Sequence, residues 1–391
     1  MNGIFIHQQI KALQDLGHSC HVILTYNWYP PLGFHRFHPY WREGYELKSN
    51  FLSDVEGVQV HQVPVLIKMP SRWFNEDPYE REANSILNYL NNHKEIKPFD
   101  WIISHFWTET SWIGILLKQK LNLPLAAFCR GDDIHEWPLS NSVLFNHLKE
   151  VYHHADLLLA NSYQLGQDAQ ALLGAKKSRK IEVVYNGVDL VKFFPVSTPA
   201  KLLLKEKFRW DPNHIQVLCV ATPVKLKGWI ELLDAFKILV SINPSLQLKA
   251  VTVTRNFPDK LDLAALAKER GMEDKLELLG QIPHSELAEI YQAADLFVLP
   301  SYNEGLANVA LEAAATNLPL VLTDVGGHRE IFESAKSVSL VPAKNQLALV
   351  DGILDQLKWL SIEKPDSRYW VEKKVGNYKK NASRLLNFLA I

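Results

Sequence analysis

Short apolar runs alternate with helical patterns of apolar and polar residues along almost the whole chain. This alternation is typical of a parallel β-sheet that is covered by helices on both faces. The runs fall into two sets, so the pattern predicts an α/β protein with two doubly wound, Rossmann-like domains. The expected strands are Cys20–Thr25, Val58–Val63, Trp101–Ser104, Leu125–Phe128, Leu157–Asn161 and Ile181–Tyr185 in the first set, and Ile215–Ala221, Leu246–Thr252, Leu276–Leu279, Leu296–Leu299 and Leu318–Leu322 in the second.

A turn-rich connector separates the two sets of strands. It contains the turn Asn186-Gly187-Val188-Asp189 and then Phe193-Phe194-Pro195, followed by a polar stretch. We therefore expect one domain over residues 1–195, a second over 196–365 and C-terminal helices over 366–391. Ligands of doubly wound sheets bind beyond the carboxyl ends of the strands, so two such domains facing each other would enclose a cleft.

The segment 300–331 carries the most specific chemical signal. An apolar run, Asp295–Pro300, leads into a polar turn with Gly305, and a helical stretch rich in Ala and Leu follows. Unpaired N–H groups and partial positive charge at a helix start make such a turn a natural seat for phosphate. Glu304 and Glu312 bracket this seat and would lie about 12 Å apart along a helix. For either glutamate alone, an ordinary helix residue is the better interpretation. The pair, together with a second glycine turn at Val325-Gly326-Gly327, instead indicates a binding site for a phosphorylated ligand that carries hydroxyl groups.

Composition narrows the class of protein. With 391 residues, 47% of them hydrophobic, the chain can fill two cores. Its 42 Lys and Arg balance 43 Asp and Glu, so no charge excess points to nucleic acid. Cys20, Cys129 and Cys219 are scattered, which favours a reducing cytoplasm and neither a disulfide framework nor a zinc site. No apolar run is long enough to span a bilayer, so we expect a cytoplasmic protein, at most peripheral at the inner face of a membrane.

The spacing from Glu304 to Glu312 resembles the E-x7-E donor-binding signature of the retaining glycosyltransferases of family 4, which have the GT-B fold. The connector also resembles the interdomain linker of that family. The resemblance implies transfer of a sugar from a nucleotide-sugar donor to a glycan, lipid-linked or small-molecule acceptor, and C-terminal helices that return to the amino domain. It implies a catalytic role for Glu304 and donor binding by Gly305, Leu306, Ala307, Asn308 and Glu312.

The start of the chain departs from this family. The residues Asn2-Gly3-Ile4-Phe5-Ile6-His7 pass directly into a helix, Gln8–Leu16, whereas in the family a first, central strand precedes the glycine turn. Either the chain is truncated at its start or its amino domain is built without that strand. Unpaired ladders of backbone groups are costly when buried, so we expect a weakened or rearranged amino domain. A chain with a restored apolar strand should melt clearly higher, and equal melting points would contradict this expectation.

Two strand ends of the first domain carry candidate polar residues. His105 follows the expected strand Trp101–Ser104, and the match to the family's D-x-x-x-x-H pattern falls on Asp100 and His105, which implies that His105 approaches the donor sugar. As one of 15 histidines it is otherwise a core or surface residue. Arg130-Gly131-Asp132-Asp133 resembles the family's H-G-x-D segment, with Arg130 in place of His. We expect Asp133 and Arg130 on the acceptor side, although Arg130 could also contact phosphate or simply pair with a neighbouring aspartate.

The second domain offers basic residues for a diphosphate. Lys227 matches the Lys of the family's Lys-Gly pair and supplies a point charge for a leaving diphosphate. The family Arg five residues earlier is Thr222 here, so Lys225 is a candidate substitute. Where the family has a glycine-rich turn near the nucleotide base, this chain has Thr254-Arg255, and Arg255 is a candidate nucleotide contact. Each of these basic residues is otherwise an ordinary surface residue.

Aromatic residues crowd the segment 26–51. Trp28, Trp41 and the later Trp73 would either stack on a sugar acceptor or lie at a membrane surface. An irregular loop that packs its own aromatic side chains is an equally good interpretation.

The reaction implied by the resemblance is retaining and needs no metal. The diphosphate leaves with stabilisation from Lys227 and from the N–H groups near Gly305 and Gly3, and it takes the proton of an acceptor that attacks from the same face. Glu312 would hold the ribose diol, and Glu304 would orient the hydroxyl groups of the sugar. No D-x-D sequence stands in the strand-end turns of the second domain, so neither a divalent metal nor a cofactor beyond the substrate is expected.

Two alternatives stay open from the sequence. A sugar-nucleotide epimerase or a phosphorylase would use the same architecture, since a fold does not fix a function. A protein that binds a nucleotide-sugar without turnover is favoured by Thr222, by the replacement at Thr254-Arg255 and by the unusual start of the chain.

Overall fold

The computed structural model describes residues 4–27, 54–55, 57–65, 77–174, 179–253, 259–360 and 364–391. The chain divides into two compact units, each described here by itself. The amino-terminal unit comprises Ile6–Ala160, Asp168–Val184 and Ala382–Ile391, and the carboxyl-terminal unit comprises Met1–Phe5, Asn161–Gln167 and Tyr185–Asn381. The division after Val184 lies ahead of the expected boundary at residue 195, and the end of the chain belongs to the amino-terminal unit.

The carboxyl-terminal unit is built on one parallel sheet of six strands in the order β10-β9-β8-β11-β12-β13. The order reverses beside β8, as in other doubly wound sheets. Five of the strands coincide closely with expected runs, whereas β13 was not predicted. The strands are β8 (Ile215–Val220), β9 (Leu246–Val251), β10 (Leu276–Gly280), β11 (Leu296–Leu299), β12 (Leu320–Thr323) and β13 (Val338–Val341).

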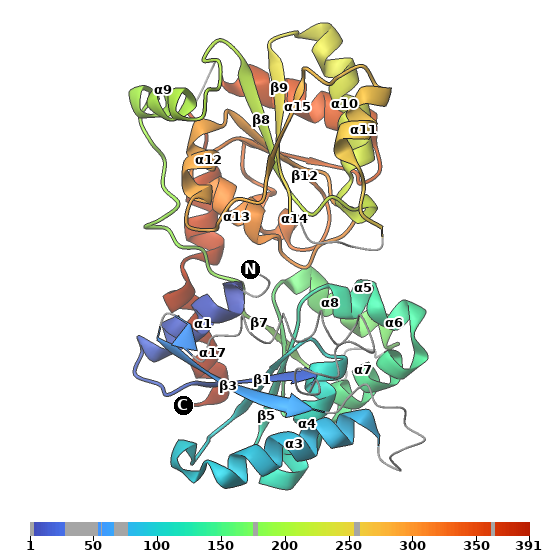
Figure 1. Cartoon of the computed structure of the whole chain (residues 1–391), viewed down its shortest axis with the longest axis vertical. Coiled ribbons are helices and arrows are strands. Elements are labelled where there is room, and N and C mark those ends of the chain that lie inside the picture. Colours follow the sequence, from blue (N-terminus) through green and yellow to red (C-terminus); the bar gives the residue numbers. More distant parts are fainter. Residues whose placement is uncertain are drawn as a thin grey trace, which may run out of the picture. The chain divides into compact units, whose positions relative to one another are not determined.

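Helices cover both faces of this sheet because successive side chains of a strand point to opposite faces. Along β8, Leu218 and Val220 join one buried cluster, and Val217 and Cys219 join another. In Figure 1, α10 and α11 lie on one side of the strands and α12 and α13 on the other. The helical segments are α9 (Thr198–Lys207), η4 (Lys225–Lys227), α10 (Trp229–Ile242), α11 (Leu263–Glu269), α12 (Leu287–Ala293), α13 (Asn308–Ala315), α14 (His328–Phe332), α15 (Gln346–Leu360), α16 (Ser367–Trp370) and η5 (Val371–Val375).

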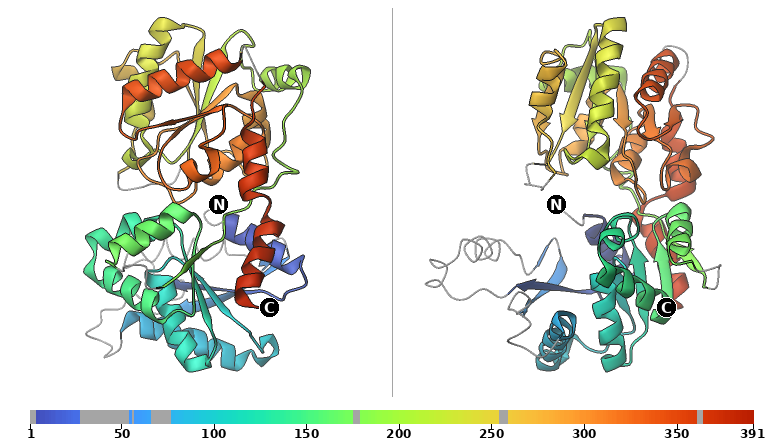
Figure 2. Two further views of the ribbon diagram at one scale, coloured as in Figure 1. Left: turned by 180° about the vertical axis from the view of Figure 1, so that it is seen from behind. Right: turned by 90° about the vertical axis from the view of Figure 1, so that its right-hand side faces the viewer.

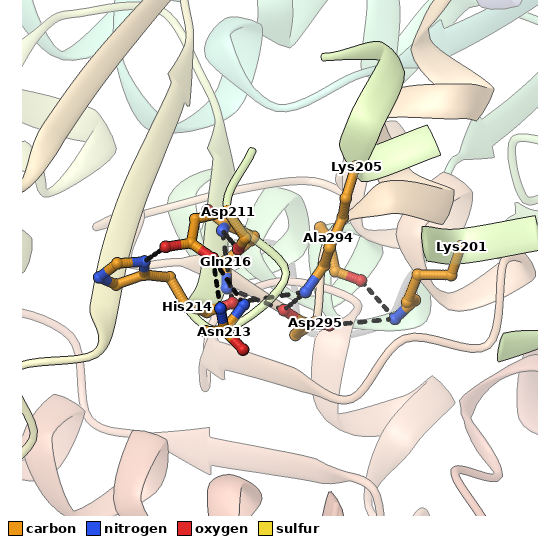
Figure 3. A network of polar contacts seen from close by, with 8 residues as sticks. All are labelled: Lys201, Lys205, Asp211, Asn213, His214, Gln216, Ala294 and Asp295. Carbon is orange, nitrogen blue, oxygen red and sulfur yellow. Dashed lines mark hydrogen bonds and ion pairs between the residues drawn. The ribbon is translucent and has the colours of Figure 1, made fainter. Parts of the chain in front are cut away.

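A buried polar network holds α9 to the amino ends of β8 and β11 (Figure 3). The carboxylate of Asp295 accepts hydrogen bonds from Lys205 Nζ at 2.7 Å, from Lys201 Nζ at 3.4 Å and from the backbone N–H of Gln216 at 2.9 Å. The Lys205 side chain is only 5% exposed. Each of these charged groups has partners, so the cost of burying them is offset.

The amino-terminal unit holds its strands in two separate sheets. The four parallel strands β4-β5-β6-β7 form one sheet, and β1, β3 and β2 form the other, with β1 parallel and β2 antiparallel to β3. Among the described residues, β1 and β4 each have a single strand neighbour. A weakened amino domain stays a prediction. The strands are β1 (His21–Asn27), β2 (Asp54–Val55), β3 (Val58–Val65), β4 (Ile102–His105), β5 (Leu125–Cys129), β6 (Leu157–Ala160) and β7 (Ile181–Val183).

One hydrophobic cluster joins the two sheets of this unit. Val63 of β3 packs with Ile86 of α3 and Ile113 of α4, and Ile23 of β1 and Ile102 of β4 lie against the same cluster. The two sheets are seen as separate ribbons in Figure 2. The first helix begins at Ile4, earlier than predicted. The helices are α1 (Ile4–Gln14), α3 (Pro78–Asn92), η3 (Lys94–Ile96), α4 (Glu109–Leu121), α5 (Asp132–His135), α6 (Trp137–Ser140), α7 (Ser142–His154), α8 (Tyr163–Leu172) and α17 (Tyr378–Leu389), and the division between the two units falls within α1, α8 and α17.

Within the ranges that the structure describes, no helix combines the length and the apolar character needed to cross a membrane.

Candidate active site

Three loops of the carboxyl-terminal unit follow the adjacent parallel strands β8, β11 and β12, and their ends meet at the same edge of the sheet. Glycine lets the loops approach closely. Gly228 has φ +69°, and a Cβ there would lie 2.0 Å from the carbonyl oxygen of Pro300. Gly326 has φ +53°, and its Cβ would lie 2.0 Å from the carbonyl oxygen of Glu304. Both positions therefore exclude larger residues.

Lys227 and Glu304 form an ion pair between two of these loops, with 2.8 Å between Nζ and Oε1. The exposed fractions are 27% for the Lys227 side chain and 15% for that of Glu304. Burial by itself would raise the pKa of the Glu304 carboxyl, but the ammonium of Lys227 outweighs it and holds the pKa below its usual value. Glu304 is therefore ionised at neutral pH. Of the three predicted catalytic residues, Lys227 and Glu304 lie together here, whereas His105 belongs to the amino-terminal unit.

Lys225, predicted as a substitute cation, lies at the start of the same turn and is exposed. Thr222, which takes the place of the family Arg, accepts the indole N–H of Trp229 at its backbone carbonyl oxygen, with 2.9 Å between the atoms. The indole thereby anchors the loop after β8 to the first residue of α10.

The turn before α13 presents unpaired backbone N–H groups. Those of Leu306, Ala307 and Asn308 donate to no acceptor among the described residues. The side chains of Leu306 and Ala307 are buried in the core, so their contribution to a ligand is restricted to the backbone. The Asn308 side chain accepts a hydrogen bond from Asn186 Nδ2 at 2.9 Å, which fixes the start of the helix. This arrangement suits a bound anion.

Glu312 lies one helix turn further along α13 and is 5% exposed. Its Oε1 accepts from His284 Nε2 at 2.7 Å, and its Oε2 accepts from the Tyr291 hydroxyl at 3.1 Å. Burial raises the pKa of Tyr291 well above its usual value, and the charge of Glu312 adds to this effect, so the phenol remains a donor. Neither His284 nor Tyr291 was predicted from the sequence.

His328 is a further polar residue that the sequence analysis missed. It begins α14 directly after the Gly326-Gly327 turn and is fully buried. Its Nδ1 donates to the carbonyl oxygen of Thr323 at 2.8 Å, and within the described part of the chain its buried Nε2 has no partner. Burial lowers the pKa of His328, with the charge of Glu304 acting in the opposite direction, so the ring is neutral.

The amino-terminal unit brings His105 and Arg130 together at the ends of the paired strands β4 and β5. His105 Nδ1 lies 2.7 Å from Arg130 Nη2 and 3.2 Å from Nε. A guanidinium only donates, so Nδ1 is the acceptor and the His105 proton sits on Nε2. Burial, assisted by the charge of Arg130, lowers the pKa of His105 well below its usual value. His105 is thus a neutral hydrogen-bond donor, and it ends β4 instead of following it.

The buried carboxylate of Asp133 is hydrogen-bonded to the backbone of two loops. It accepts the backbone N–H groups of Trp107 at 2.7 Å, Arg130 at 2.8 Å and Gly131 at 2.9 Å, and it is fully buried. It therefore holds the loops after β4 and β5 against each other. An acceptor contact for Asp133 or Arg130 stays a prediction.

Several predicted positions lie outside the described residues. These are Gly3 at the start of the chain, the replacement Thr254-Arg255, and the aromatic residues Trp28, Trp41 and Trp73.

Two family models cover nearly the whole chain. The model described as Glycosyltransferase Family 4 matches residues 3–192, and the one described as Glycosyl transferases group 1 matches residues 201–373. The protein is thus a glycosyltransferase built from two Rossmann-like units. The chain belongs to glycosyltransferase family 4.

Curated relatives support this assignment. The Bacillus subtilis protein TuaC, a glycosyltransferase named for teichuronic acid biosynthesis, is 27% identical over 90% of this chain and 84% of its own. D-inositol 3-phosphate glycosyltransferase 2 of Catenulispora acidiphila is 30% identical over 66% of this chain and 63% of its own.

Solved structures show the same fold. Sucrose-phosphate synthase from Thermosynechococcus elongatus superposes with a TM-score of 0.78 and 19% identity, covering 100% of this chain and 93% of its own. Anabaena HepE in complex with UDP gives a TM-score of 0.68 and 17% identity over 94% of this chain and 99% of its own.

Proposed function

We propose that this enzyme transfers a sugar from a nucleotide-sugar donor to a glycan, lipid-linked or small-molecule acceptor, with retention of configuration and without a metal. The unpaired amides of Leu306, Ala307 and Asn308 carry the proposal, because they form an anion seat on the helix that also bears Glu312. Lys227 and Glu304 border the same turn. That HepE has been crystallised with UDP and with UDP-glucose supports a nucleotide-sugar as the donor class.

In the carboxyl-terminal unit, different residues contact the diphosphate, the ribose and the sugar of the donor. Negative charge develops on the diphosphate as the bond to the anomeric carbon breaks, and Lys227 together with the helix amides stabilises it. Glu312 accepts hydrogen bonds from the hydroxyl groups of the ribose, and the ionised Glu304 accepts hydrogen bonds from those of the sugar. In the amino-terminal unit, the family resemblance implies that His105 approaches the donor sugar, and its Nε2–H is the group with which it would donate. The leaving phosphate takes the proton of the acceptor on the face from which it departs.

The absence of a metal requirement is part of the proposal. Mg²⁺ is usually held by carboxylates together with the phosphates of the substrate. Here the charge of Glu304 is already paired with that of Lys227, and Glu312 is buried. The turns after the strands of this unit contain no D-x-D sequence. Transfer should therefore continue in excess chelator, and complete loss of transfer there would contradict metal independence.

A nucleotide screen tests the donor class. UDP-, GDP- and ADP-sugars are added to the purified protein in a thermal shift assay, because a ligand that binds the native state raises the melting point. We expect one nucleotide series to respond and calorimetry to confirm it. The response should be lost in the double variant E304A/E312A. Failure of every nucleotide to bind the folded protein would refute the proposal, as would affinity that the double variant retains.

Retention is tested separately, once an acceptor is known. NMR of the product formed in the first minutes should show the same anomeric configuration as the donor. An inverted product would contradict the proposed stereochemistry and leave the donor class standing.

One observation favours a second candidate, binding of a nucleotide-sugar without turnover. Thr222 stands where the family has an Arg, so Lys227 acts on the diphosphate without that second charge. Binding of a nucleoside diphosphate with neither transfer nor hydrolysis of any donor would support this candidate. Measurable transfer by the wild-type chain would exclude it.

A further inference from the structure

The surroundings of Glu312 contain a chain of contacts that begins outside the donor turn. Lys192, in the connector that precedes α9, directs its ammonium at the Nδ1 of His284, with 2.9 Å between the nitrogens. The same ammonium donates to the backbone carbonyl oxygen of His284. His284 in turn lies 2.7 Å from Glu312 Oε1 through its Nε2. Three consecutive polar groups, the ammonium of Lys192, the imidazole of His284 and the carboxylate of Glu312, therefore link the connector segment to α13.

The chemistry of the lysine fixes the tautomer of the histidine. An ammonium has three N–H donors and no acceptor, so the Nδ1 of His284 must carry a lone pair. The ring proton then resides on Nε2, which is the nitrogen that faces Glu312. A neutral imidazole in this tautomer donates to the carboxylate, and the hydrogen bond is strengthened by the charge of its acceptor.

The ring of His284 is held firmly in place. Besides its two contacts with Lys192, it packs edge-on against Phe193, with 5.6 Å between the ring centroids. Phe193 is itself buried in the core. The His284 side chain is 24% exposed and that of Glu312 is 7% exposed, so the imidazole lies at the boundary between the buried carboxylate and the surface. An imidazole restrained on two sides is a fixed part of the site.

Glu312 keeps acceptor capacity for a ligand in this arrangement. A carboxylate has about four lone-pair positions, and His284 and Tyr291 use one on each oxygen. One position on each oxygen remains for the two hydroxyl groups of a cis diol. The donors on the protein side also prevent the carboxylate from rotating away.

We infer that His284, in the tautomer set by Lys192, is a positioning residue that orients Glu312 toward the ribose of the donor nucleotide. The inference rests on the proposed function, because it assigns the ribose to Glu312. It goes beyond that function by naming a relay that couples the connector segment to ribose recognition. His284 itself is not required to touch the donor.

The test compares ribose recognition in matched variants. UDP, ADP and GDP, each with its 2′-deoxy counterpart, are titrated calorimetrically into wild-type protein, and the pair that binds becomes the probe. In wild type the deoxy nucleotide should bind clearly more weakly. His284→Leu should weaken binding of the ribonucleotide by about ten-fold, which is the usual effect of losing a hydrogen bond to a charged group. It should also reduce the ratio between the two affinities toward one.

Conservative variants separate positioning from folding. The Nε2 amide of His284→Gln reaches the place of the imidazole Nε2–H, so it should retain affinity within about three-fold of wild type. Lys192→Met should leave the ring present but unanchored, and both the affinity and the ratio should lie between those of wild type and His284→Leu. Spectra of ¹⁵N-histidine-labelled protein should show an unprotonated Nδ1 at His284, a readout that does not depend on the nucleotide.

The possible failures are distinguishable. An unchanged ribose-to-deoxyribose ratio in folded His284→Leu or Lys192→Met, tighter binding in either, or a protonated Nδ1 would overturn the relay alone. Absence of binding by all three ribonucleotides to wild type would overturn the proposed function, and the relay with it.

Discussion

Two lysine–carboxylate pairs lie at opposite ends of the same six-stranded sheet. At the amino ends, Lys205 and Asp295 are 2.7 Å apart, and a second lysine and a backbone N–H complete the coordination of the carboxylate. At the carboxyl ends, Lys227 and Glu304 are 2.8 Å apart and lie beside a turn with unpaired amides. The two distances are nearly equal, so the ion pairs alone do not show which of them stabilises the fold and which binds a ligand. The neighbouring groups do, because the carboxylate of Asp295 accepts from three donors, whereas Glu304 lies beside backbone N–H groups that have no acceptor among the described residues.

The largest expected effect is on stability, from Asp295→Ala. This change leaves the 5% exposed Lys205 without its partner and leaves the Gln216 N–H unpaired. Breaking a buried ion pair in this way costs about 3–5 kcal/mol of unfolding free energy. Urea denaturation measures the loss, and nucleotide affinity of the molecules that remain folded should match wild type. A loss below about 1 kcal/mol would show that the network is not structural.

Lys227→Met should lower activity strongly and stability only slightly, the reverse of Asp295→Ala. Removing one preorganised charge from a leaving group typically lowers kcat by roughly 100- to 1000-fold. The loss of unfolding free energy should be smaller than for Asp295→Ala, because more than a quarter of the Lys227 side chain is exposed and Glu304 can take up a proton. Single-turnover kinetics and urea denaturation on the same preparations provide the comparison. An activity within ten-fold of wild type would refute the role of Lys227.

A third carboxylate, that of Glu330, makes the stability of the protein depend on pH. Glu330 on α14 accepts the backbone N–H of Tyr163 at 3.0 Å on each oxygen, and burial raises its pKa to about 7. The unfolded chain loses this proton near its usual value of 4.5, whereas the folded protein keeps it until about pH 7. This group therefore makes the unfolding free energy fall as pH rises through that window.

Glu330→Gln should remove this slope and stabilise the protein at pH 8 by about 1 kcal/mol, after allowance for solvent screening. The amide oxygen of Gln can still accept the Tyr163 N–H. Urea denaturation at pH 5, 6, 7 and 8 measures the effect. A variant that is less stable than wild type at pH 8 would contradict the raised pKa.

The smallest effect is expected for Lys225→Met, a matched control for Lys227. The two lysines share one turn. Lys225, however, is exposed and has no hydrogen-bond or ion-pair partner among the described residues. An exposed charge acts on a ligand mainly at long range and is screened by salt, so kcat should change by less than about three-fold. A loss comparable to that of Lys227→Met would make Lys225 the replacement for the absent arginine.

The sequence allowed the architecture to be predicted because parallel strands leave long apolar runs such as those of β8 and β11. It did not predict β13, since Val338–Val341 is interrupted by Ser339 and its two central residues are only half-buried. Lys227 and Glu304 were each predicted, but their ion pair was not, because the residues lie far apart in the chain. The contact of His105 with Arg130 could have been predicted, because His105 ends β4 and Arg130 directly follows the adjacent parallel strand β5. The contact of Lys192 with His284 was not, since connector residues follow no periodic pattern.

The divided sheet of the amino-terminal unit has a consequence for behaviour in solution. Among the described residues, β1 and β4 each present one row of peptide groups that no strand of the same molecule covers. Such rows recruit strands from other molecules. Concentrated preparations should therefore associate mainly through the amino-terminal unit, whose two sheets have four edge strands among the described residues (β1, β2, β4 and β7), against two, β10 and β13, in the other unit.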